Sequence, residues 1–162
     1  MLLIIDSKGY LVDSSTLLNW KRRITGTDPK EARFRKWIRA VFQIGLLNIS
    51  RAIEEEIERN SPTLSKVLKK WGVKPIDFGL GPDPTTAEAE VMLAQLEAEG
   101  RITSNSCVGV NDLRIILIAE RYELAVVTDE AHGKDRCNMP TVCRERGVPC
   151  VRSADLLAER GF

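Results

Sequence analysis

Hydrophobic and polar positions alternate along this chain in blocks that predict strands and helices in turn. Short apolar runs predict buried strands over residues 10–12, 46–49, 125–128 and 148–151. A polar or small residue that suits a helix start follows each run, and a longer stretch with apolar residues at helical spacing comes next. Strands that alternate with helices predict a mostly parallel sheet with helices on both faces, so the predicted fold class is α/β.

The helical stretches differ in how they are bounded and how apolar they are. Caps are predicted from Ser, Thr or Asp directly before the periodic stretch, at Asp28, Ser50, Ser61, Thr86 and Ser153. Helices are predicted over 14–23, 29–44, 51–57, 62–71, 87–99, 112–123, 140–146 and 154–160. The stretch 112–123 is apolar nearly all round, which predicts a helix buried against the sheet. A further short strand is predicted over 1–5, and residues 73–86 form the one long irregular segment.

Composition narrows the class of protein. The chain has 162 residues, 43% hydrophobic and 29% charged, which predicts one globular domain over 1–162. The net charge of +1 creates no global field, so affinity for nucleic acid would need local clustering of charge. The apolar runs are too short to span a membrane, and no signal peptide is recognisable. Four cysteines without a CxxC pair indicate reduced thiols, and we expect a cytoplasmic protein without a membrane partner.

Four acids stand where predicted strands end or helices begin: Asp13, Glu56, Asp112 and Asp129. Because parallel strands end at the same edge of a sheet, we expect these carboxylates to converge there. Four like charges so close would repel one another unless a cation neutralised them. Mg²⁺ or Mn²⁺ suits oxygen ligands of this kind, and such an ion assists displacement at phosphorus. The acids therefore predict metal-assisted hydrolysis of phosphodiesters.

Each acid also has a structural interpretation that stays open at this point. Asp13 and Asp112 would serve equally as caps of the helices that follow them. Asp129 stands at a strand end, where aspartate is a common turn residue. Glu56 belongs to an acidic run on a helix, and such a run is usually a solvated face. Only the joint placement of all four favours a site.

Four stretches, in order along the chain, resemble the motifs of PIN-domain nucleases. They are Tyr10-Leu11-Val12-Asp13-Ser14-Ser15-Thr16-Leu17-Leu18 and the stretches 49–57, 109–119 and 125–129. The tail, from Met139-Pro140-Thr141-Val142-Cys143 through Cys150-Val151 to Leu156-Leu157, resembles a bacterial PIN subgroup of uncharacterised function. The order of the motifs holds across nearly the whole chain.

The resemblance implies a three-layer α/β/α sandwich, a Mg²⁺ or Mn²⁺ site and cleavage of single-stranded RNA. Many bacterial members are toxins of toxin–antitoxin pairs, neutralised by an antitoxin protein, and a homodimer is usual. The family's metal-binding acids match Asp13, Glu56, Asp112 and Asp129. The polar residues that support the first and last of these match Ser15 and Thr128.

Two assignments within the motifs have alternatives. Asp6 also ends an apolar run, but Ser14-Ser15-Thr16 after Asp13 fits the first motif better than Ser7-Lys8-Gly9 does. Glu56 is chosen by its place in the second motif, with Glu55 as the alternative. The excursion at 60–86 is longer than a minimal domain of this family needs.

Basic residues supply candidates for contacts with the substrate. Residues 21–39 hold eight lysines and arginines against two acids, so Lys21 and Arg22 are candidates for phosphate contacts, with a solvated helix face as the alternative. Lys134 and Arg136 are further candidates in the loop after Asp129. Trp20 would stack on a base or, more simply, pack in the core. His132 is left out of the catalytic set.

Two other functions compete with a nuclease. The first is a PIN-like scaffold that binds protein or RNA without cleaving it. The second is a nucleotide-binding domain of the doubly wound type. No glycine-rich phosphate loop follows the first main strand, which disfavours the second.

Overall fold

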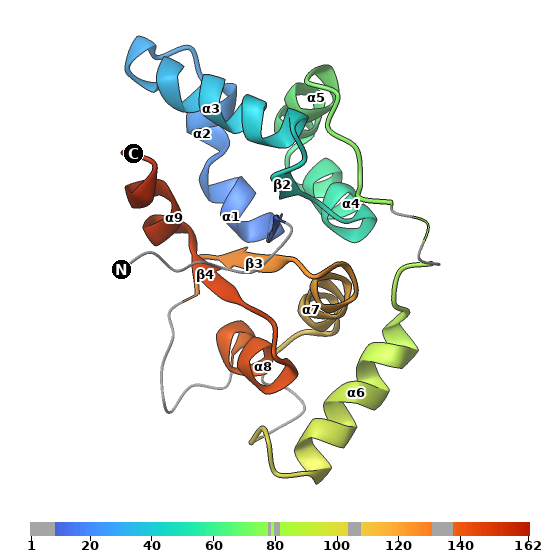
Figure 1. The fold of residues 1–162 in the computed structure, drawn as a ribbon. Coiled ribbons are helices and arrows are strands. Elements are labelled where there is room, and N and C mark those ends of the chain that lie inside the picture. The colour runs from blue at the N-terminus through green and yellow to red at the C-terminus, as the bar shows by residue number, and fades with distance from the viewer. Residues whose placement is uncertain (1–8, 78, 80–81, 104–107, 131–137) are drawn as a thin grey trace.

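A four-stranded parallel sheet lies at the centre of the fold. The computed structural model describes residues 9–77, 79, 82–103, 108–130 and 138–162. The strands are β1 (Tyr10–Val12), β2 (Leu47–Asn48), β3 (Ala125–Thr128) and β4 (Cys150–Arg152), arranged β2-β1-β3-β4 and all parallel. Helices flank the sheet in a three-layer α/β/α arrangement, which confirms the predicted fold class (Figure 1).

The helices follow the predicted alternation closely. They are α1 (Ser14–Asn19), α2 (Lys21–Thr25), the 3₁₀ turn η1 (Pro29–Glu31), α3 (Ala32–Gln43), α4 (Arg51–Asn60), α5 (Pro62–Lys70), α6 (Thr86–Ala98), α7 (Val110–Tyr122), α8 (Met139–Arg146) and α9 (Ser153–Glu159). Among the described helices, none combines the length and the apolar character that crossing a bilayer requires. The strand predicted over 1–5 and the loop 131–137 lie outside the described residues.

The predicted helix 14–23 is two helices, and the residue between them is buried. Trp20 separates α1 from α2 with backbone angles φ −83° and ψ −3°. Its ring is 5% exposed and packs edge-to-face on Phe34, with ring centroids 5.9 Å apart. Trp20 is therefore a core residue, and it is not available to stack on a base.

Three of the predicted helix starts, those of α6, α7 and α9, are wrong by one or two residues. Thr85, not Thr86, caps α6, because only Thr85 has a glutamate three residues later, and Glu88 closes a reciprocal capping box. Gly109 is the N-cap of α7, so Asp112 lies inside the helix. Ser153 is the first residue of α9, and its hydroxyl is used elsewhere. Ser50 does cap α4, as predicted, by accepting the N–H of Ile53 at 3.2 Å.

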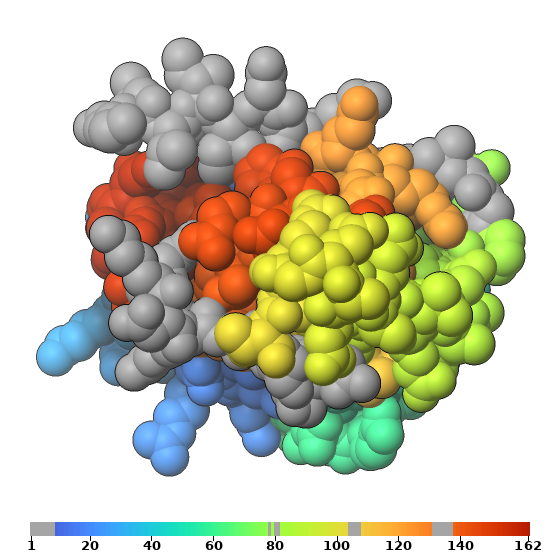
Figure 2. Space-filling model, turned by 90° about the horizontal axis from the view of Figure 1, so that it is seen from below, coloured from blue at the N-terminus to red at the C-terminus, as the bar shows by residue number. Residues whose placement is uncertain are grey.

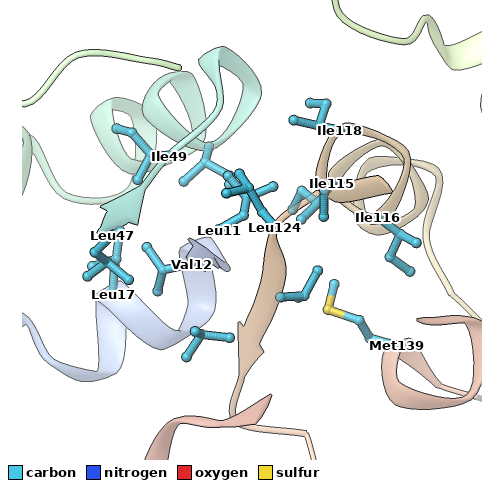
Figure 3. Packing of buried hydrophobic residues seen from close by; sticks show 14 of the residues in the cluster. Leu11, Val12, Leu17, Leu47, Ile49, Ile115, Ile116, Ile118, Leu124 and Met139 are labelled. Atoms are coloured by element: carbon cyan, nitrogen blue, oxygen red, sulfur yellow. The ribbon is translucent and has the colours of Figure 1, made fainter. Parts of the chain in front are cut away.

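The two central strands are buried on both sides. Leu11, Val12 and the β3 residues up to Val127 have no exposed surface, which explains why both strands read as unbroken apolar runs. Figure 3 shows Leu17 of α1 on one side of β3, and Ile115 and Ile116 of α7 with Met139 of α8 on the other. The core thus fills both spaces between the sheet and its helices.

The strand order reverses at one point of the sheet. The chain runs from β1 to β2 on one side and then returns to β3 on the other side of β1. In open α/β sheets, ligands bind beyond the carboxyl ends of the strands where the order reverses in this way. That point here lies between the ends of β1 and β3.

The helix α6 packs on α7 and forms the prominent ridge of Figure 2, well outside the sheet layer.

Candidate functional site

Asp13 lies at the carboxyl end of β1 and is almost fully buried, with 4% of its surface exposed. It caps α1, since its Oδ1 accepts the backbone N–H of Ser15 at 3.2 Å. The hydroxyls of Ser15 and Thr128 donate to Oδ2 at 2.9 and 3.3 Å, and the Ser14 hydroxyl donates to Oδ1 at 3.4 Å. Asp13 is therefore both a cap and a rigidly oriented carboxylate, so the two interpretations of this residue do not compete.

The pairing of β1 with β3 brings Thr128 to Asp13. Val12 lies opposite Val127 in the parallel register, and the Asp13 N–H donates to the Val127 carbonyl at 3.0 Å. Thr128 is fully buried, and its Oγ1 also accepts the N–H of Glu130 at 3.2 Å. One hydroxyl thus links the acid that ends β1 to the chain that leaves β3. The predicted supporting residues Ser15 and Thr128 both contact Asp13.

Asp112 lies in the first turn of α7 and is half-buried. Burial, which is the largest cause, and the negative charges of Asp13, Glu130 and Glu56 together raise the pKa of Asp112 to about 6. A hydrogen bond from the backbone of Gly109 acts in the opposite direction on this pKa. The structure therefore brings Asp112 within electrostatic reach of three other carboxylates. We call these four residues, Asp13, Glu56, Asp112 and Glu130, the acidic cluster.

Glu56 reaches this cluster from α4. Its side chain is half-buried, and it acts on Asp112, whereas the neighbouring Glu55 is exposed. Glu55 instead lines a separate groove of about 430 Å³ between α4 and α7, together with Arg51 and Arg114. A helix turns by about 100° per residue, so adjacent glutamates face different neighbours. The placement favours Glu56 over Glu55 as the member of the acidic site.

Asp129 lies at the same edge but binds other partners. Its carboxylate accepts hydrogen bonds from the Asn19 side chain of α1 and from the Ser153 hydroxyl of α9. The charges that raise the pKa of Asp112 include that of Glu130 and do not include that of Asp129. Sequence reasoning missed Glu130, although successive residues at a strand end point to opposite sides and Glu130 directly follows Asp129.

Glu130 is held in place by α8. Its Oε2 accepts the backbone N–H of Met139, the first residue of α8, at 2.9 Å. Negative charge is favourable at a helix N-terminus, so α8 stabilises this carboxylate where it stands. This hydrogen bond joins the residue that follows Asp129 to the start of α8.

The donor chemistry of the cluster suits a hard divalent cation, but the side chains are not gathered around one point. Among the described residues, no three or more acids, histidines or cysteines stand close enough together to hold a metal ion. The described groups around Asp13 are hydroxyls and an amide, and no cationic group acts on Asp112. The negative charge is thus uncompensated in the described part of the site.

The predicted substrate contacts are only partly placed. Lys21 is half-buried and Arg22 exposed on α2, and neither forms an ion pair with another described residue. Lys134 and Arg136 lie outside the described residues, as does Asp6, the alternative first ligand. Their assignment stays a prediction.

Comparison with known proteins places the chain in one family. The model of a domain of unknown function (DUF4411) matches residues 10–162, which spans every strand and helix described above. No curated protein and no solved structure matches the chain.

Proposed function

The chain belongs to DUF4411, a domain family of unknown function, and from that premise we propose that it is a metal-dependent endoribonuclease. The reaction would be hydrolysis of phosphodiester bonds in single-stranded RNA. The cofactor would be Mg²⁺ or Mn²⁺, bound at the acidic cluster. The family assignment carries no activity of its own, so the proposal is argued from the site.

One observation carries the proposal: Asp112 lies within electrostatic reach of three carboxylates that come from other parts of the chain, namely Asp13, Glu56 and Glu130. Burial and the charges of Asp13, Glu130 and Glu56 together hold the pKa of Asp112 at about 6, far above its ordinary value of 3.8. Such repulsion destabilises the folded chain, and a structural role for the cluster does not require it. A divalent cation would remove the repulsion, which supports a site built for one.

The residues would divide the work according to their surroundings. Asp13 would be the fixed ligand, because four hydrogen bonds hold its carboxylate in one orientation. Asp112 and Glu56, both half-buried on helices, would complete the site from α7 and α4. The ion, when bound, supplies neutralising charge and polarises the phosphate. Asp112 would release its proton as that charge arrives, because the repulsion that raises its pKa is then offset.

Asp129 has a different role in this proposal. Through Asn19 and Ser153 it joins the end of α1 to the start of α9 at the edge of the sheet. It would thus position the elements that flank the cluster. A direct role of Asp129 as a metal ligand stays a prediction from the family resemblance.

The test is cleavage of single-stranded RNA with and without Mn²⁺, using Asp13→Asn and a matched control. Asp28→Asn is that control, because Asp28 also caps a helical turn and also accepts the N–H two residues later, at 2.9 Å. We expect Asp13→Asn to abolish metal-dependent cleavage and Asp28→Asn to keep it. Full activity of a folded Asp13→Asn protein would refute the assignment.

A scaffold without activity is the rival function, and metal-dependent melting separates the two. A ligand that binds only the folded state stabilises it by RT ln(1 + [L]/Kd). We expect millimolar Mn²⁺ to raise the melting temperature, and no shift would favour the scaffold. An antitoxin partner and a homodimer remain proposals that rest on the family resemblance alone.

A further inference from the structure

The basic residues between Lys21 and Arg39 do not act as one patch. Arg23 forms an ion pair with Glu31 at 2.9 Å, and Arg33 donates hydrogen bonds to two carbonyls near the end of the chain. Lys36 and Arg39 are exposed on α3, and neither forms an ion pair with another described residue. Part of the basic charge is thus used inside the fold, and part is left facing outward.

The outward-facing part lines a groove of about 490 Å³ on α3. Its lining residues are Arg35, Lys36, Arg39, Ala40, Gln43 and Trp71. Three of these side chains are cationic, and no acid is among the described residues that line it. A groove with this excess of positive charge favours an anionic ligand.

The wall of the groove is held in position from both ends. Arg35 donates from Nη2 to the Asp28 carbonyl at 2.8 Å, which fixes its guanidinium beside the start of α3. Gln43 donates from Nε2 to the Trp71 carbonyl at 3.5 Å, which ties the end of α3 to the end of α5 (Figure 1). Arg35, Arg39 and Gln43 recur every four residues, so they form one ridge with steps of about 6 Å.

Trp71 supplies an aromatic face next to these cations. It is the C-cap residue of α5 and is half-buried, with part of the ring against the hydrophobic core. The remaining part borders the groove. Proteins hold single-stranded nucleic acids by two kinds of contact. Cationic side chains contact the phosphates, and aromatic rings stack on the bases.

We propose that this groove binds single-stranded RNA. The inference rests on the proposed function for the choice of RNA, and it adds a second contact surface to it. The groove reaches Gln43, four residues before β2 begins, and Tyr10 at the start of β1 donates its N–H to Leu46. The groove therefore extends to the edge where strands begin, whereas the acidic cluster lies where they end.

Binding is measured with a short fluorescein-labelled oligouridylate in EDTA, so that metal-dependent cleavage does not interfere. The test variant is Lys36→Gln/Arg39→Gln. The matched control is Arg59→Gln/Lys66→Gln, which removes the same charge from exposed helix positions outside the groove. We expect the test variant to bind at least tenfold more weakly and its salt slope to fall by about 1.4, since single strands give about 0.7 per phosphate contact. The control is expected to bind like the unmodified chain.

Trp71→Phe supplies an independent measurement. Trp71 borders the groove, whereas Trp20 is buried and Trp37 packs on Phe34 and Phe162 without lining the groove. RNA is therefore expected to quench tryptophan fluorescence in the unmodified chain and not in Trp71→Phe. Equal weakening in the test and control variants, unchanged quenching in Trp71→Phe, or no RNA binding would overturn the inference. So would tighter binding of an oligoglutamate peptide, which would indicate an acidic protein partner.

The outcome is separable from that of the proposed function. Groove-dependent binding without cleavage in Mn²⁺ would refute the nuclease and leave the groove assignment standing. Cleavage in Mn²⁺ together with RNA binding that the groove variants do not weaken would support the nuclease and refute the groove assignment. Both assays use the full chain.

Discussion

Asp112→Asn is expected to stabilise the metal-free protein, although it removes a charge from the first turn of a helix. The carboxylate of Asp112 is half-buried and surrounded by the negative charges of Asp13, Glu56 and Glu130. Asparagine has nearly the same shape and carries no charge. Its side-chain oxygen retains the capacity to accept the hydrogen bond that Gly109 donates. The substitution therefore removes both the cost of burying a charge and the repulsion, and it keeps the local contacts.

The magnitude follows from the pKa. A rise from 3.8 in the unfolded chain to about 6 in the folded chain corresponds to about 3 kcal/mol, at about 1.4 kcal/mol per tenfold change in the ionisation constant. Asp112 is only half-buried, and solvent screening lowers this to roughly 1–2 kcal/mol.

The effect has a defined dependence on pH. Between pH 3.8 and about 6 the folded state binds more protons at Asp112 than the unfolded state does, so this residue lowers stability as the pH rises. Below this window Asp112 is protonated in both states and costs nothing. The advantage of Asp112→Asn should therefore be a few tenths of a kcal/mol at about pH 4 and complete above about pH 7.

Urea unfolding in EDTA at these two pH values measures the difference. Asp155→Asn is the matched control, because Asp155 also lies in the first turn of a helix but is exposed. It should lose the roughly 0.3–1 kcal/mol of a favourable charge at a helix N-terminus, which is the opposite sign. If Asp112→Asn destabilises the chain at pH 7 as Asp155→Asn does, the repulsive cluster is refuted.

Three further predictions test the other parts of the site and the core. Glu130→Gln should reduce the rise in melting temperature caused by Mn²⁺, whereas Asp129→Asn should keep most of that rise. Asp129→Asn should instead lower the free energy of unfolding by roughly 1–3 kcal/mol through its lost hydrogen bonds. The reverse pattern would restore Asp129 as the ligand. Thr128→Val should lower the free energy of unfolding in urea by roughly 1–3 kcal/mol, because Asp13 and the Glu130 N–H both lose a buried hydroxyl partner. Thr128→Ser keeps the hydroxyl and should lower it less, and equal losses in both variants would contradict this reason. Phe34→Ala should cost roughly 3–5 kcal/mol, because the ring is 1% exposed and packs against other aromatic rings and a guanidinium; a cost below 1 kcal/mol would show that the site is not close-packed.

The alternation of strands and helices could be predicted from the sequence because it depends on local periodicity. Strands that are buried on both faces read as apolar runs, and helices carry their own cap residues. Asp13 could be recognised as a strand end followed by a helix start for the same reason. Even the one-residue error at Thr85 had a local signal, because Glu88 stands three residues after it.

The identity of the fourth acid depended on tertiary structure. Asp129 and Glu130 are adjacent, and the direction in which each points depends on how the chain leaves β3. Asn19 and Ser153 take Asp129, while Met139 and Thr128 hold Glu130. These partners come from four separate segments, and a pattern of hydrophobic and polar positions does not encode distances between segments.

The use of the basic residues was decided in the same way. The sequence predicted a cluster of positive charge between Lys21 and Arg39 but could not divide it. Arg33 finds its acceptors at Arg160 and Gly161, more than a hundred residues away, while Lys36 and Arg39 are left beside Trp71. Local sequence thus determined which elements form and where charges stand on them. Only the packing of those elements decided which charges meet partners and which remain for a ligand.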